Sequence, residues 1–80
     1  MIQNEICKIL ENLLEIDSVS TDKTLEELKV NSIIFIRLVV ECEQRFHIEF
    51  EDEMLLMSEF PNLKSFIEYV QTRAGDGIES

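Results

Sequence analysis

The chain has 80 residues, enough for one small domain, and its 45% hydrophobic and 30% charged content is ordinary for a folded protein. With 17 acidic and 7 basic side chains, its formal net charge is −10, which excludes nucleic acid and anionic membranes as partners and favours proteins with basic surfaces. Because two glycines and one proline leave few positions for tight turns, we expect an all-α fold.

The first predicted element is an amphipathic helix that begins at Ile2 and ends near Glu15 or Ile16. Apolar residues recur along it at spacings of three and four, namely Ile2, Ile6, Ile9, Leu10, Leu13 and Leu14. Such a stripe faces a core. We expect a cytosolic, free-standing protein, because this helix starts directly after Met1 and neither a signal peptide nor a membrane span is recognisable.

A long first loop should follow, since residues 17–23 are rich in Ser, Thr and Asp. Thr24 and Glu27 have the spacing of a capping box, which predicts one capped helical turn at the end of this loop. Leu25 and Leu28 would anchor that turn to the core. Loops of this length between helices usually carry function.

The second predicted helix spans residues 32–46. Its inward stripe is predicted to consist of Ile36, Val39, Val40 and Phe46, with help from Leu38 and Cys42. Its polar residues should face outward, and Arg45 near the C-terminus suits the helix dipole.

The remaining elements are an extended connector over residues 47–50, a short third helix opened by residues 51–53, and a last helix capped by Asn62. The inward stripe of the last helix is predicted to be Leu63, Phe66, Ile67 and Val70. We therefore expect a small four-helix bundle, with three main helices and a short third one, over residues 1–73, and a disordered tail over residues 74–80. The predicted central packing residues are Leu13, Leu38, Phe46, Phe50 and Phe66.

Nothing in the sequence predicts a metal site or an oligomer. Cys7, Cys42 and His47 do not have the spacing of metal ligands, and the two cysteines suit buried positions in a reducing compartment. The acidic run over residues 49–53 does not match a calcium-binding loop. We expect a monomer without bound metal.

Ser32 lies at the junction between the loop and the second helix. There its hydroxyl lies at the positive end of the helix dipole, a suitable place for a phosphate ester, although a serine that simply caps the helix explains the same position. His47 lies about 22 Å away along the helix, too far to activate Ser32. We therefore expect a protein that is not an enzyme, whose serine only another enzyme can modify.

Read together, these segments resemble an acyl carrier protein. That family has an apolar-acidic-acidic-Leu turn, a Gly-Ala-Asp-Ser-Leu motif, an acidic-edged second helix ending in Phe, and a connector with Ile-Pro. The corresponding segments here are Leu25-Glu26-Glu27-Leu28, Lys29-Val30-Asn31-Ser32-Ile33, Glu41 to Phe46, and Ile48-Glu49-Phe50-Glu51. The last helix is also similar, so the resemblance runs from about Ile2 to Thr72.

The resemblance implies that a phosphopantetheinyl transferase attaches 4′-phosphopantetheine from coenzyme A to Ser32, which makes the chain a phosphoprotein that carries acyl or aminoacyl groups as thioesters. Loading and condensing enzymes would then dock in turn. The residues it implies for docking are Asn31, Ile33, Ile34, Phe35, Arg37, Glu41 and Glu43. A space for the acyl chain would be lined by Val39, Cys42, Phe50, Met54 and Leu55.

Several residues depart from the family pattern. Asn31 stands where the family has Asp, Lys29 where it has Gly, and Arg37 where it has an acidic residue. Ile34 and Phe35 replace polar residues, and we expect both to be partly exposed near the arm. These departures favour a dedicated carrier of polyketide or nonribosomal-type biosynthesis. The alternatives are a housekeeping carrier of fatty-acid synthesis and an interaction module that is never modified.

Overall fold

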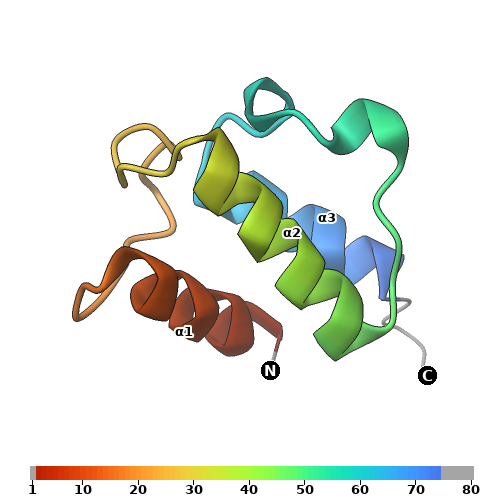
Figure 1. Ribbon diagram of the computed structural model, residues 1–80, viewed down its shortest axis with the longest axis horizontal. Coiled ribbons are helices and arrows are strands. Elements are labelled where there is room, and N and C mark those ends of the chain that lie inside the picture. Colours follow the sequence, from red (N-terminus) through yellow and green to blue (C-terminus); the bar gives the residue numbers. More distant parts are fainter. Residues whose placement is uncertain (1, 75–80) are drawn as a thin grey trace.

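The structure is a computed structural model that describes residues 2–74, and within these residues it is all-helical, as the sequence predicts. Three α-helices, α1 (Ile2–Leu14), α2 (Ser32–Phe46) and α3 (Leu63–Arg73), are joined by two long connections. Figure 1 shows α3 behind α2, and the connection between them swings outward before it returns to the start of α3. None of the described helices is long and apolar enough to span a membrane. Most of the predicted tail, residues 75–80, lies outside the described residues.

One hydrophobic core holds the three helices together. Helix α1 packs against both α2 and α3, and the aromatic rings of Phe35 on α2 and Phe66 on α3 lie 6.0 Å apart. The inward stripe predicted for α3 is confirmed, because all four of its residues are buried. Of the five predicted central residues, Leu38, Phe50 and Phe66 are buried, whereas Leu13 and Phe46 are only partly buried at the edge of the core.

The predicted short third helix is replaced by two separate 3₁₀ turns, η1 (Asp52–Met54) and η2 (Met57–Glu59). Between them the backbone of Leu56 is extended, with φ −121° and ψ 130°, and its side chain is exposed. The first turn of an α-helix is unfavourable to form, and a run this short adds few further hydrogen bonds to offset that free-energy cost. The described residues therefore hold three α-helices and two short 3₁₀ turns, and the predicted four-helix bundle is not confirmed.

The first long connection is fastened to the start of α3. The first N–H groups of α3, those of Leu63 and Lys64, donate to the carbonyl oxygens of Lys23 and Thr21 at 3.1 and 3.0 Å. Asn62 caps α3 as predicted, because its Oδ1 accepts the N–H of Ser65 at 2.8 Å. The backbone N–H groups at the N-terminus of α3 thus have hydrogen-bond acceptors both in the adjacent Asn62 and in the distant first connection.

The connector that follows α2 is held by side chains from two helices. A carboxylate oxygen of Glu43 accepts the backbone N–H of Phe50 at 3.0 Å. On the other side, Arg73 Nε donates to the carbonyl oxygen of Glu49 at 3.1 Å, and Tyr69 accepts the N–H of Glu51 at 3.2 Å. The connector begins with the left-handed His47, continues without helix or strand to Phe50, and bridges α2 and α3.

Candidate functional site

The segment before α2 is a capped turn that ends in a left-handed residue. The predicted capping box is confirmed, since Thr24 and Glu27 each accept the other's backbone N–H at 2.9 Å. At its end, Val30 donates to Leu25 O and Lys29 donates to Glu26 O, both at 2.9 Å, which is the bond pattern of a Schellman motif. Because this motif needs a left-handed residue, Lys29 has a φ of 69°.

We expect Lys29→Gly to stabilise the protein. A non-glycine residue in the left-handed region costs about 1–2 kcal/mol, and the greater unfolded-state freedom of glycine offsets roughly 0.5–1 kcal/mol of that gain. The free energy of unfolding, measured by urea denaturation, should therefore rise by about 0.5–1 kcal/mol.

The matched control for this variant is His47→Gly at the opposite end of α2, where φ is 56° and the same backbone argument applies. Both variants should gain stability. If only His47→Gly does so, the Lys29 side chain makes a stabilising contribution that the backbone argument omits.

Asn31, and not Ser32, is the residue that caps α2. Its backbone is extended, and its Oδ1 accepts the N–H of Ile34 at 2.8 Å. Asn and Asp are both strong N-caps, so replacing the family's Asp by Asn keeps the cap and removes a negative charge. The alternative in which Ser32 merely caps the helix is therefore wrong.

Ser32 is the first residue of α2, and its side chain is exposed. Within residues 2–74, no protein partner is found for its hydroxyl or for the N–H groups of Ser32 and Ile33. Unpaired N–H groups at a helix start favour an anion, and the helix dipole adds to that preference. An exposed hydroxyl and backbone N–H groups that favour an anion thus lie at the same point.

The other residues predicted for docking divide into an exposed and a buried group. Ile33 is 69% exposed and Arg37 is also exposed, whereas Ile34 packs partly against the core. Phe35 is only 1% exposed, so its predicted exposure near the arm is wrong. Its ring lies in the core because α3 and residue 60 supply aromatic partners that the local sequence does not reveal.

The predicted inward stripe of α2 is also partly wrong. Ile36 and Val40, expected to face the core, are 44% and 43% exposed. The residues of α2 that are buried are Phe35, Leu38, Val39 and Cys42. Their spacing of three, four and seven is that of one helix face, but Ile36 and Val40 lie on a second face that satisfies helical spacing equally well, so periodicity alone does not distinguish the two. The exposed apolar residues of α2 were missed for the same reason.

The acidic docking candidates are occupied within the fold. Glu43 is partly buried and accepts the N–H of Phe50, as described above. Glu41 is exposed, and one of its oxygens lies 3.5 Å from Arg45 Nε. Arg45 also bonds to Glu5 on α1 at 3.0 Å, which links α1 to α2. Neither carboxylate is as free for a partner as the sequence suggests.

The predicted acyl-chain space coincides with packed core. Val39, Cys42 and Phe50 are buried, and Met54 and Leu55 pack against them at the core's edge. Around Phe50 gather three aromatic rings with centroids 5.0–6.5 Å away, those of Phe60, Phe66 and Tyr69. A carried chain would enter this region only by displacing these rings, so the role of these residues in holding a chain stays a prediction.

The protein's own thiols are poorly suited to carry an acyl group. Burial, with a smaller contribution from Glu41, raises the pKa of the Cys42 thiol to about 12. Burial and then Glu11 raise the pKa of Cys7 as well. Because the thiolate is the nucleophile, the raised pKa values make both cysteines poorer nucleophiles near neutral pH.

The fold and the site together define a small helical domain that presents one serine at the start of a helix. The family model described as the phosphopantetheine attachment site matches residues 3–70. The chain therefore belongs to this family, and the acyl carrier resemblance is confirmed. No curated protein and no solved structure gives a significant match.

The group that this family carries is 4′-phosphopantetheine, bound covalently. The residues at the start of α2 fit it, because Ser32 offers an exposed hydroxyl and the N–H groups of Ser32 and Ile33 suit an adjacent phosphodiester. The neutral cap Asn31 places no carboxylate next to that anion. When attached, the group supplies a terminal thiol that forms thioesters.

Proposed function

We propose that this protein carries acyl or aminoacyl groups as thioesters on a phosphopantetheine arm attached to Ser32. The observation that supports the proposal most directly is the division of roles at the start of α2. Asn31 caps the helix, so the exposed Ser32 hydroxyl is free for modification without loss of the helix end. Family membership supports the same assignment.

In this proposal the protein holds and presents the carried group, and other enzymes perform the chemistry. A serine needs a neighbouring base to become nucleophilic, and His47 lies at the opposite end of α2 from Ser32. A phosphopantetheinyl transferase would therefore bring the base that removes the hydroxyl proton. Loading and condensing enzymes would then act on the thiol of the arm.

We further propose that the pathway is a specialised one, of the polyketide or nonribosomal type. Support comes from Lys29, Asn31 and Arg37, which stand where the resembled family has Gly, Asp and an acidic residue. A housekeeping carrier must serve many enzymes that read acidic groups on this helix. Neutral and basic replacements suit a smaller set of dedicated partners.

The test is intact-protein mass spectrometry after incubation with coenzyme A, magnesium and a broad-specificity phosphopantetheinyl transferase. We expect the protein to gain one phosphopantetheine, which fragmentation should locate on Ser32. Circular dichroism of the same sample establishes that the protein is folded. A folded protein that gains nothing with two different transferases would contradict the proposal and favour the unmodified interaction module.

A further inference from the structure

The segment around Ser32 has the opposite charge to the rest of the chain. Acidic residues occupy 17 of the 80 positions, yet none lies between Leu28 and Val40, a stretch that contains the basic residues Lys29 and Arg37. Both basic side chains are exposed. The start of α2 is therefore locally basic on a molecule whose formal net charge is −10.

This basic segment carries an exposed apolar stripe. Ile33, Ile36, Arg37 and Val40 follow one another at helical spacing on the outer face of α2, and we call them the α2 stripe. A shallow hollow is lined by Ser32 and the first three of these residues. A second hollow continues along Ile36, Arg37 and Val40 to Leu13 on α1, and Glu41, which pairs with Arg45, lines its edge. The surface is thus continuous from Ser32 across about two turns of helix.

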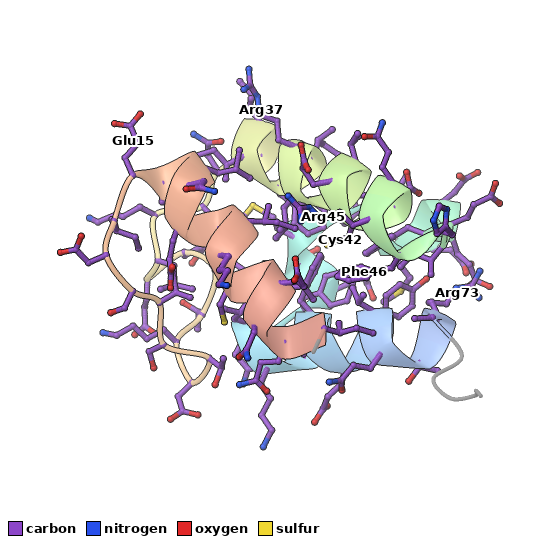
Figure 2. The ribbon with its side chains drawn as sticks, turned by 90° about the horizontal axis from the view of Figure 1, so that it is seen from below. Glu15, Arg37, Cys42, Arg45, Phe46 and Arg73 are labelled. Atoms are coloured by element: carbon purple, nitrogen blue, oxygen red, sulfur yellow. The ribbon has the colours of Figure 1, made fainter. Side chains whose placement is uncertain are left out.

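Arg37 lies in the middle of this surface without a carboxylate partner among the described residues. The nearest candidate in sequence, Glu41, pairs with Arg45 instead. Figure 2 shows the difference, since Arg37 points away from the body of the protein and Arg45 lies between α1 and α2. A partner that covers the stripe would remove water from Arg37, which is unfavourable unless that partner supplies a negative charge.

We propose that the α2 stripe docks enzymes that act on the arm, through a partner surface of apolar side chains with a carboxylate placed opposite Arg37. The inference rests on the proposed function, because an enzyme that reaches the arm at Ser32 must approach the surface that begins there. It departs from what the net charge alone predicts, namely a basic partner. The contact is selective because a lysine facing Arg37 would be repelled.

The salt concentration determines whether a partner responds mainly to Arg37 or to the net negative charge of the molecule. At about 0.15 M ionic strength, charges separated by more than about 8 Å are largely screened. Acidic residues beyond that distance then act weakly on a group docked at the stripe, whereas Arg37 acts at contact distance. Glu41, at the end of the surface, is already paired with Arg45. At low salt the distant acidic residues also repel an acidic partner, so the preference for such a partner should weaken.

The test uses two synthetic helical peptides that share the same leucine positions, one with glutamate and the other with lysine at the remaining surface positions. Each is titrated into ¹⁵N-labelled protein, with and without the arm, at about 0.15 M salt. We expect the glutamate peptide to shift the amide signals of the α2 stripe and to bind roughly two- to fivefold tighter than the lysine peptide.

Variants can distinguish the effect of the charge at Arg37 from the effect of the net charge of the protein. Arg37→Glu should reverse the preference between the two peptides. Lys64→Glu makes the same change in net charge at an exposed position on α3 and should leave the preference unaltered. Ile36→Ala should weaken both peptides alike, because it removes apolar contact and no charge.

Three results would overturn the inference. The first is a wild-type preference for the lysine peptide at this salt, or an Arg37→Glu variant that behaves like wild type. The second is a shift of the stripe signals on concentrating the protein alone, which would make a second copy the occupant. The third is a glutamate peptide that shifts the stripe signals only when the arm is absent, which would make the arm itself the occupant. Mass spectrometry of each sample reports the arm separately, so failure to load contradicts the proposed function while the peptide result stands independently.

Discussion

Ser32→Ala should abolish attachment of phosphopantetheine while the protein keeps its helices and its stability. The hydroxyl oxygen is the atom that would bond to phosphorus, and alanine offers no replacement. The helix end is unaffected because Asn31 provides the cap and the Ser32 side chain is exposed. The free energy of unfolding should therefore change by no more than about 0.5 kcal/mol. Intact mass after treatment with transferase, together with urea denaturation, measures both quantities.

Asn31→Ala is the complementary control. It removes the cap and leaves the hydroxyl, so it should lower the free energy of unfolding by about 1 kcal/mol and still permit attachment. Asn31→Asp should keep the cap, and Ser58→Ala, at another exposed serine, should load normally. Loading of Ser32→Ala would show that the attachment site is elsewhere. A large loss of stability in that variant would show that Ser32 contributes to the helix end after all.

Phe35→Ala should destabilise the protein by about 3–5 kcal/mol, the usual cost of removing a buried phenyl ring. The side chain is 1% exposed, and its ring lies 6.0 Å from the rings of both Phe60 and Phe66. A domain of this size has a total stability of the same order, so the variant should be largely unfolded near room temperature. Thermal and urea denaturation followed by circular dichroism measure the loss.

Two further variants show whether the effect comes from the core. Phe35→Leu keeps most of the apolar volume and should cost less than about 1.5 kcal/mol. Ile33→Ala, two residues earlier and 69% exposed, should change stability by no more than about 0.5 kcal/mol. If Phe35→Ala instead remained stable and lost transfer to partner enzymes, Phe35 would be a docking residue, as the sequence pattern indicates.

The local signals of the chain predicted the helices well. The bounds of α2 agree with the prediction, and the caps at Thr24 and Asn62 form as expected. Each of these features depends on residues within one turn of one another, so the necessary information is contiguous in the sequence. From Asp52 to Glu59 the structure has two 3₁₀ turns where one short helix was predicted. An acidic start followed by an apolar run suits a turn of α-helix and a 3₁₀ turn equally, so the sequence did not distinguish them.

Which face of α2 is buried was harder to predict from the sequence. Four consecutive apolar residues, from Ile33 to Ile36, let two different stripes satisfy helical spacing. One contains Ile36 and Val40, and the other contains Phe35, Leu38 and Val39. Periodicity cannot choose between them, because the choice depends on what lies opposite in space. Aromatic rings from residue 60 and from α3 select Phe35.

The sequence by itself determined that the protein is all-helical and that a serine stands at the start of its second helix. It also determined the family, because that motif and its flanking segments are continuous along the chain. Only the tertiary structure decided which side chain caps that helix and which apolar residues remain exposed beside the serine. The physical reason is that helix formation and capping propensity are local, whereas burial is a property of surfaces brought together from distant parts of the chain.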